Sequence, residues 1–492
     1  MTGGPGLEAA VRNLLHEALD RCRDDPRAAG PLRHQLARLD QPLRVAIAGP
    51  WRSGKSTLLN ALMGETVAPV GEVAGSEAFV WYEDGPVPRA TAWSTGQPPQ
   101  ELAVARSAAG MRVDLGGHAA DGLTDIVVQW PTRSLRQLTL IDTPALGGAD
   151  DPGPTIGRLL HEADAVLHLT RDGRDSDLRV LEAGRESLVG QAAPVPVVLV
   201  RSRADETGGG QIGALLTARQ LARRQQRDPR VAALCLHVVA CSGAVGLAGR
   251  TLGEAEFAAL AELARVPRPQ LEGHLLSADR FLRGELPVYV DTADRAALLD
   301  RLGLFGVRLA TTLVRTGCDT RATLAAELVR RSGLAELRES VHRLFVDRQG
   351  VLKARSALAA VETVARTRPA PDTRALLDSV ERVLAGAHEF AELRLFAALR
   401  GDRSGFDAAA VEEARRLIGG EGAGLAARLG VDHDVPVHRL WEAAGEAQRR
   451  WRERAEDPRL RLGQRRGAQV VARSCEGMLA ELVDRSRRPA PA

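Results

Sequence analysis

One octapeptide limits the possible folds of this chain more than any other feature. Residues 49–56 read Gly-Pro-Trp-Arg-Ser-Gly-Lys-Ser, which has the spacing G-x-x-x-x-G-K-S of a phosphate-binding loop. Leu43, Val45 and Ile47 alternate with other residues ahead of the loop, as in a strand, and the leucines after it share one helical face. Backbone N–H groups of such a loop, and of the helix start that follows, point at phosphates. The sequence therefore predicts an α/β domain of the P-loop type.

The loop residues receive separate expected roles. Lys55 is expected to reach the β- and γ-phosphates, and Ser56 to place its hydroxyl on Mg²⁺. The chain contains 66 Lys+Arg, yet only two of them are lysines, Lys55 and Lys353. An ammonium is a compact point charge that suits a phosphate pocket, so the rare use of lysine supports the assignment. The loop residues expected to bind nucleotide are Gly49, Ser53, Gly54, Lys55, Ser56 and Thr57.

An acidic residue at the end of a later hydrophobic strand is the expected partner of the metal. Residues 136–141 read as a strand that leads into D-T-P-A, and its Asp142 fits the role of holding Mg²⁺. GTPases usually have D-x-x-G here, and Ala145 narrows the permitted backbone angles. Leu146 follows where Ras-like enzymes hold the glutamine that orients water. Catalytic assistance must therefore come from another residue.

A hydroxyl that completes the Mg²⁺ shell is expected between the first helix of the P-loop domain and its second strand. In nucleotide switches this segment closes over the γ-phosphate. Ser76 is the first candidate for this catalytic and metal-binding hydroxyl, and Thr66 is its rival. A plain turn role for Ser76 is the alternative, because serine is common in turns.

Two loops that follow later strands are expected to hold the base. A strand at 196–200 runs into R-S-R-A-D, at the place of the guanine motif [N/T]-K-x-D. Asp205 would accept from the N1 and N2 donors of guanine, a pair that adenine lacks, which argues against an ATPase. Arg203 would cover the base with its aliphatic stem; an exposed charged loop is the alternative. The candidates on the base side are Ser202, Arg203, Asp205 and, in a loop that resembles the S-A-K loop of GTPases, Ser242 and Gly243.

Composition and the remaining pattern bound the whole chain. The 492 residues are 44% hydrophobic with net charge +3, and five scattered cysteines lack any C-x-x-C, which indicates a globular protein of a reducing compartment. Neither a signal sequence nor a run of about 18 apolar residues is present, so a cytoplasmic protein is expected. Alternating strands and helices imply a mostly parallel sheet with helices on both faces. Residues 84–122 are interpreted as an insertion that carries one helix at 99–108.

Helices are expected at both ends of the chain. The apolar stripe of a helix at 7–23 needs a partner surface, which we expect the C-terminal helices to supply as a neck. A single helix longer than 30 residues is expected at 334–367, which suggests an elongated bundle. The expected domains are an N-terminal neck helix within 1–40, the P-loop domain at 41–285 and a helical neck and trunk at 286–492. Other helical stretches are predicted at 293–315, 321–331, 373–400, 406–417, 438–456 and 463–484.

The C-terminal tail is rich in arginine. Residues 449–492 contain 12 Arg against 6 Asp+Glu, and Trp441 and Trp451 lie within or near this stretch. Contact with anionic lipid or nucleic acid is one interpretation. A solvated helix face with salt bridges is the other, and the sequence leaves both open.

The motif order resembles the dynamin superfamily. GPWRSGKSTLLNALMG, LTLIDTPA, VVLVRSRAD and CSGAVGL, with a helix before and long helices after, look most similar to the bacterial dynamin-like GTPases of actinobacteria, of the isoniazid-inducible type. The motif match covers about residues 40–250, and LLDRLGLFGVRLA and VLKARSAL extend it into the helical half. Ala145, Ser202 and Arg203 depart from the usual GTPase pattern.

The resemblance implies a function and partners. It implies binding and hydrolysis of GTP with Mg²⁺, dimerisation through the nucleotide face with a second copy or a related paralogue, and work on membranes through the helical neck and trunk. Anionic lipid is then a candidate partner, with peripheral placement at the inner face of the plasma membrane, and no DNA partner is expected. The alternative is a regulatory GTPase whose helical half binds a protein or RNA.

Arg52 is the expected source of catalytic assistance. It lies in the phosphate loop three residues before Lys55, where the loop resembles the G-x-x-R-x-G-K-S of guanylate-binding proteins. That resemblance implies an arginine finger in cis, swung onto the γ-phosphate when a partner presses on the nucleotide face. A surface role for Arg52 is the alternative, because the chain uses arginine freely.

Overall fold

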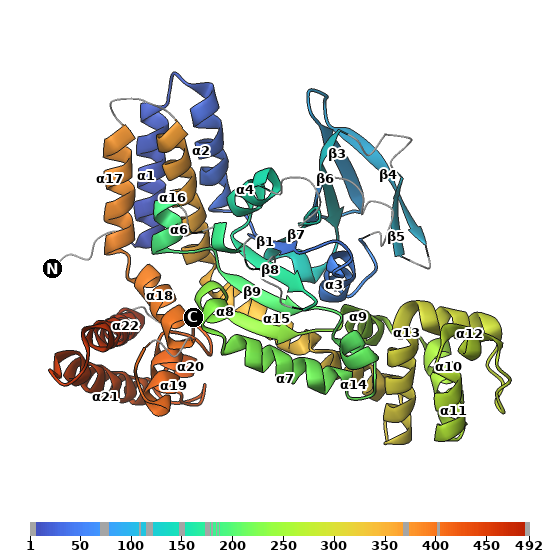
Figure 1. Ribbon diagram of the computed structural model, residues 1–492. Helices are drawn as coiled ribbons and strands as arrows, with labels where there is room; N and C mark the ends of the chain where they lie inside the picture. The colour runs from blue at the N-terminus through green and yellow to red at the C-terminus, as the bar shows by residue number, and fades with distance from the viewer. Residues whose placement is uncertain are drawn as a thin grey trace.

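The computed structural model consists of a central sheet with helical units around it (Figure 1). A bundle of α1, α2, α16 and α17 lies on one side of the sheet, and α10–α13 lie at the opposite end of the molecule. A second helical group, α18–α22, lies below the first bundle in this view. The structure describes residues 6–68, 78–107, 110–114, 122–146, 153–172, 178, 181–183, 185, 187–367, 373–400 and 404–487.

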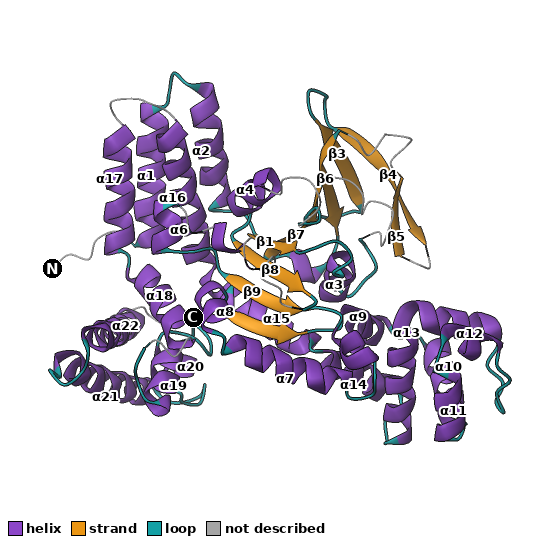
Figure 2. Cartoon of the chain, viewed as in Figure 1, coloured by secondary structure: helices purple, strands orange, loops and turns teal. Residues whose placement is uncertain are grey.

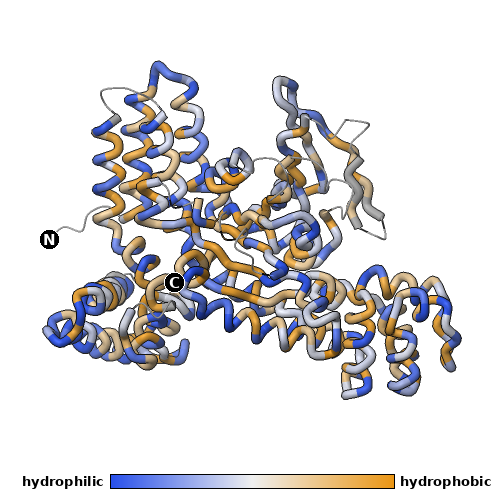
Figure 3. The backbone as a smooth tube through the Cα atoms, in the orientation of Figure 1, coloured by the Kyte–Doolittle hydropathy of each residue, from blue (hydrophilic) through white to orange (hydrophobic). Residues whose placement is uncertain are grey.

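The sheet has the strand order β10-β9-β8-β1-β7-β2-β6-β3-β4-β5. Its parallel part comprises β1 (Leu43–Ala48), β7 (Leu138–Asp142), β8 (Ala165–Thr170), β9 (Val197–Arg201) and β10 (His237–Ala240). All residues of β1 and β8 are buried, as expected for strands covered on both faces. Figure 3 shows the hydrophobic colour following these strands. The predicted P-loop α/β fold is confirmed.

The other half of the sheet corrects one expectation. β2 (Phe79–Asp84) pairs antiparallel with β7 and parallel with β6 (Leu123–Trp130), and β3 (Arg89–Ser94), β4 (Gln100–Ser107) and β5 (Gly110–Asp114) continue the sheet as antiparallel strands. The helix predicted at 99–108 is therefore wrong, because these residues form β4. Leu102 is buried between exposed neighbours in a period of two, and the ladders to β3 and β5 satisfy the backbone.

Helices surround the parallel part of the sheet. α13 and α14 pack on α9 and α10, and α15 reaches α3 and β10. The helices from the P-loop onward are α3 (Lys55–Met63), α4 (Gly153–Glu162), α6 (Leu188–Ala192), α7 (Ala214–Gln226), α8 (Pro229–Leu234), α9 (Gly243–Thr251), α10 (Glu254–Arg265), α11 (Arg268–His274), α12 (Ala278–Arg283), α13 (Thr292–Arg315), α14 (Arg321–Ser332) and α15 (Leu334–Leu344).

The N-terminal helix packs on C-terminal helices, as expected. α1 (Leu7–Arg21) contacts α16 (Gln349–Thr367) and α17 (Thr373–Gly386), and it buries Val11, Leu14, Leu15 and Ala18. A second N-terminal helix, α2 (Pro26–Arg38), was not expected from the sequence. Asp25 caps it by accepting from Arg27 N and Ala28 N, and Pro26 stands at the first turn, where proline is favoured.

The single long helix predicted at 334–367 is also wrong. α15 ends at Leu344, a 3₁₀ turn spans Val346–Arg348, and α16 begins at Gln349. Phe345 at the break is fully buried. The break lets α15 cover α3 and β10 while α16 covers α1 and α2. One straight helix could not follow both surfaces.

The C-terminal residues form a separate helical group (Figure 2). It consists of α18 (His388–Arg400), α19 (Ala408–Leu417), α20 (Leu425–Leu429), α21 (Val437–Glu456) and α22 (Leu462–Arg487), with α21 and α22 as an antiparallel hairpin. Trp451 is fully buried and meets Phe406 edge to face at 5.4 Å. Among the helices that the structure describes, none is both long and apolar enough to cross a membrane.

Candidate nucleotide site

The phosphate loop depends on glycine at two points. Gly49 has φ +151°, and a Cβ there would lie 2.6 Å from Leu169 O, so strand β8 passes too close for any side chain. Gly54 has φ +90° and ends the loop where α3 begins. The loop therefore presents backbone rather than side chains at the start of α3, where unpaired N–H groups favour an anion.

Lys55 is held by the loop itself. Its Nζ donates to Gly49 O at 3.3 Å and to Pro50 O at 3.4 Å, which are long contacts for a charged donor. Burial lowers the pKa of Lys55, and the nearby Asp142 carboxylate opposes this shift. A buried ammonium with weak partners is suited to a stronger anion such as a phosphate.

Ser56 and Asp142 form a pair that fits a metal ion. Ser56 Oγ donates to Asp142 Oδ2 at 2.7 Å, so the structure joins the start of α3 to the end of β7. Asp142 Oδ1 is buried and has no hydrogen-bond partner among the described residues. Burial raises the pKa of Asp142, and the hydrogen bond from Ser56 opposes that shift. A hydroxyl beside a carboxylate oxygen with free lone pairs is the oxygen donor set that Mg²⁺ prefers.

The segment after Asp142 is fixed to the phosphate loop. Thr143 Oγ1 donates to Ile47 O at 3.1 Å, and Leu146 N donates to Gly49 O at 3.0 Å. The Leu146 side chain is buried in the hydrophobic core. Leu146 therefore has a packing role, which agrees with the expectation that it does not orient water.

The two candidate switch hydroxyls have different outcomes. Ser76 lies outside the described residues. Thr66 lies beyond the C-terminal end of α3, whose nine residues rise roughly 13 Å from the phosphate loop. Its carbonyl accepts from Met111 N at 2.8 Å, and Asn60 Oδ1 fixes the next residue by accepting from Val67 N at 2.8 Å. The structure does not bring Thr66 to the metal pair.

Arg203 connects the expected base loop to the phosphate loop. It has φ +51°, and its Nη1 donates to Arg52 O at 3.1 Å. Its Nε donates to Glu206 Oε1 at 2.6 Å, and Glu206 Oε2 accepts from Arg171 Nη2 at 2.8 Å. Asp205 is half-buried in the 3₁₀ segment Ala204–Gly209. Sequence reasoning missed Glu206, although its spacing of three from Arg203 in a helical turn was a usable signal.

The two serines expected near the base make local contacts. Ser202 Oγ donates to Thr170 O at 3.3 Å, which holds the end of β9 to the end of β8. Ser242 caps α9 by accepting from Val245 N at 3.3 Å, and its own N–H donates to Ser332 O. Gly243 lies where a Cβ would be 3.3 Å from the Leu58 backbone, so α9 and α3 approach closely. These loops therefore stand beside the start of α3.

Comparison with known proteins identifies the family. No family model matches the chain. The isoniazid-induced protein IniC of Mycobacterium tuberculosis, in strains CDC 1551 / Oshkosh and ATCC 25618 / H37Rv, is 36% identical over 484 residues, which cover 96% of this chain and 98% of that protein. The chain belongs to the IniC family. This membership confirms the resemblance to bacterial dynamin-like GTPases of the isoniazid-inducible type, and with it the expected enzyme class.

Other similarities of this IniC family member are more distant. The tRNA modification GTPase MnmE of Acidiphilium cryptum (strain JF-5) is 28% identical over 212 residues, which cover 43% of this chain and 36% of MnmE. Two solved structures of an oligomerised bacterial dynamin pair have TM-scores of 0.30 and 0.31 at 13% identity. They cover 98% and 99% of this chain and 75% and 77% of theirs. TM-scores this low carry no structural argument.

Arg52 is the one loop side chain of this IniC family member left open to an incoming group. It is exposed, and its guanidinium makes no hydrogen bond or ion pair with any described residue, whereas its carbonyl is held by Arg203. Its φ of +57° is a left-handed value that non-glycine residues seldom adopt. The neighbouring Trp51 is 55% exposed.

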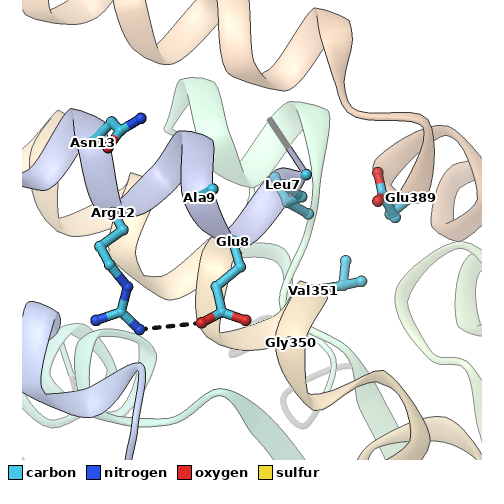
Figure 4. A pocket seen from close by; sticks show the side chains of 9 residues that line it. Leu7, Glu8, Ala9, Arg12, Asn13, Gly350, Val351 and Glu389 are labelled. Atoms are coloured by element: carbon cyan, nitrogen blue, oxygen red, sulfur yellow. Dashed lines mark hydrogen bonds and ion pairs between the residues drawn. The ribbon is translucent and has the colours of Figure 1, made fainter. Parts of the chain in front are cut away.

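A separate cavity lies far from this site in the sequence (Figure 4). It measures about 540 Å³ and is lined by the starts of α1 and α16 together with Glu389 of α18. Arg12 is its cationic residue, and Arg12 already pairs with Glu8 at 3.1 Å and with Asp40 at 2.9 Å. Because the acidic Glu8 and Glu389 share the lining, the cavity does not suit a nucleoside triphosphate.

Proposed function

We propose that the chain binds GTP with Mg²⁺ and hydrolyses it as a dynamin-like GTPase that dimerises through its nucleotide face. The observation that carries this proposal is the contact of Ser56 with Asp142, which leaves a buried carboxylate oxygen without a partner directly beside the phosphate loop. The proposal is further supported by membership of the IniC family and by the similarity to a GTPase over 212 residues.

The proposed roles follow the chemistry of each side chain. Lys55 binds the β- and γ-phosphates, and Ser56 and Asp142 hold the metal, with Ser76 as the proposed third hydroxyl. When bound, Mg²⁺ bridges the phosphate oxygens and neutralises charge that develops on them. Asp205 accepts from guanine. The remaining contacts are proposed for Gly49, Ser53, Gly54 and Thr57 on the phosphates and for Ser202, Arg203, Ser242 and Gly243 around the base.

Arg203 supports a defined guanine pocket. Its guanidinium is held by Glu206 on one side and by the Arg52 carbonyl on the other, so its aliphatic stem has a fixed direction between the base loop and the phosphate loop. A positioned stem offers a flat apolar surface to a base while the charged head stays hydrogen-bonded.

The helical half is proposed to couple nucleotide turnover to membrane binding or remodelling. The proposed domains remain a neck helix within 1–40, the GTPase domain at 41–285 and the helical neck and trunk at 286–492. The neck is well suited to coupling because the bundle of α1, α2, α16 and α17 joins both ends of the chain. Buried Arg38 of α2 also donates to Asp164 Oδ1 at 2.8 Å, next to β8 of the GTPase domain.

The decisive experiment measures GTP and ATP turnover against protein concentration, with and without Mg²⁺ and liposomes. We expect GTP to be preferred, turnover per molecule to rise with concentration, and Asp142→Asn to lower it by at least about 100-fold because the metal loses its anionic ligand. Asp84→Asn, at the end of β2, is the matched control and should retain activity. Equal turnover of ATP, or turnover independent of Mg²⁺, would contradict the proposal. GTP turnover that liposomes do not affect would favour the regulatory switch instead.

A further inference from the structure

We propose that the apex of the α21–α22 hairpin, residues 457–466, is a docking surface for an anionic lipid bilayer. The proposal deepens the membrane coupling proposed above and rests on it. It assigns the contact to one short loop and the first turn of α22, which Figure 2 shows as part of a hairpin at the periphery of the molecule, away from the sheet.

Most arginines on the shafts of the hairpin have acidic partners. Arg450 and Arg454 pair with Glu413 at 2.7 and 3.3 Å, and Arg485 pairs with Glu481 at 2.6 Å. Trp451, which the sequence suggested as an aromatic contact residue, is a core residue. For the shafts, the interpretation as a solvated face with salt bridges therefore holds.

The apex differs from the shafts in both charge and polarity. Residues 457–466 contain four arginines against one acid, Asp457. Arg459, Arg461 and Arg466 are exposed and make no ion pair with any residue in the described part of the chain. Leu462 lies among them and is 56% exposed. Unpaired cations around an exposed leucine form a surface that is both basic and apolar.

The apex is also ordered by its own hydrogen bonds. Asp457 Oδ1 accepts from Arg459 N at 2.9 Å, which folds the turn. Gln464 Oε1 accepts from Arg461 N at 2.9 Å at the start of α22, and Gln464 Nε2 donates to Gly405 O at 2.6 Å. The arginines therefore project from a formed turn, and ordering it on binding requires little further loss of entropy.

The combination favours lipid over nucleic acid. Guanidiniums attract anionic headgroups, and a leucine between them can enter the boundary between headgroups and acyl chains. Single-stranded nucleic acid is usually held by aromatic stacking as well as charge, and residues 457–466 contain no aromatic residue. A phosphate backbone would leave Leu462 without a use.

The test is vesicle flotation of the full chain with zwitterionic vesicles and with vesicles that contain phosphatidylglycerol. We expect binding to the anionic vesicles only. The triple variant Arg459→Gln, Arg461→Gln, Arg466→Gln should weaken this binding by roughly 100-fold, at about fivefold for each basic residue near the surface. Leu462→Asp should weaken it with all three arginines intact. Neither variant should change GTP turnover measured without vesicles.

The control removes the same charge from the shafts, through Arg452→Gln, Arg473→Gln and Arg485→Gln. It should retain vesicle binding; an equal loss would mean that net charge, and not the apex, is responsible. Absence of vesicle binding by the unmutated chain, with Mg²⁺-dependent GTP turnover intact, would overturn the lipid assignment and leave the GTPase proposal standing. Retention of RNA that the apex variant abolishes, without vesicle binding, would overturn it in favour of RNA.

Discussion

At the scale of single residues, Arg52 combines backbone strain with a free side chain. A left-handed conformation at a non-glycine residue costs of order 1–3 kcal/mol and persists where surrounding contacts impose it. Here the hydrogen bond from Arg203 to the Arg52 carbonyl fixes the backbone, while the Arg52 guanidinium has no described partner. Such an arrangement keeps the guanidinium near the proposed γ-phosphate position without tying it down in the isolated chain.

We predict that Arg52→Ala binds GTP normally but loses the acceleration that rises with protein concentration. Where it has been measured, an arginine finger contributes about 10³–10⁵ in rate. Arg52→Lys is the matched variant, and it should recover only part of the rate because an ammonium lacks the planar fork of donors. Single-turnover kinetics at several protein concentrations provide the measurement. A dimeric Arg52→Ala protein that hydrolyses GTP at the unmutated rate would remove Arg52 from the mechanism.

At the scale of elements, the short helix α6 is held at both ends by the helical half of the chain. Glu362 of α16 accepts from Leu188 N at 2.7 Å and from Val189 N at 2.8 Å at the start of α6. At its other end, Arg355 donates to Ala193 O at 2.9 Å, and Arg394 donates to Ala192 O at the same distance. Acid at the N-terminus and base at the C-terminus complement the helix dipole. Burial lowers the pKa of Arg355 to about 10, still well above neutral pH.

Glu362→Gln should therefore destabilise the chain by about 1–3 kcal/mol. The glutamine amide presents a donor to one of the two buried N–H groups, which is then left without an acceptor. Glu339→Gln is the control, because Glu339 is exposed and pairs with Arg343 at 3.6 Å only; it should change stability by less than about 0.5 kcal/mol. Urea unfolding of the two variants measures the difference. Equal midpoints for both variants would show that the contact between α16 and α6 is not part of the cooperative core.

The sequence predicted elements whose local signals and tertiary contacts agree. Residues 165–170 form β8 as predicted, and the P-loop and Asp142 meet because motif spacing reflects a backbone requirement. The prediction failed where long-range packing decides: β4 became a strand through its ladders, and α2 formed around Pro31 because Leu32 is buried in the bundle. Nothing local to Glu362 indicated that it would cap a helix 173 residues away.

At the scale of the whole molecule, the N-terminal helices close a bundle that the C-terminal half alone leaves open. α1 and α2 cover the same face of α16. Lys353, one of the two lysines in the chain, donates to Leu39 O at 3.2 Å and also to Gln41 O, just after α2. Arg38 and Asp164 form an ion pair that is nearly fully buried, and breaking such a pair from one side costs about 3–5 kcal/mol. The N-terminal segment thus connects the neck to the sheet.

Deletion of residues 1–30 should consequently cause aggregation. It removes Val11, Leu14 and Leu15, which are at most 4% exposed, and their burial contributes roughly 5–9 kcal/mol as an upper bound, comparable with the total stability of a domain. The facing surface of α16 and α17 would then be open to solvent. Leu15→Asp should reproduce much of the effect, whereas His16→Asp on the exposed face should remain soluble and monodisperse in size-exclusion chromatography. A soluble truncated protein with an unchanged melting temperature would mean that the GTPase domain and the remaining helices are stable without α1, and the bundle would lose its role as the structural link between the two ends of the chain.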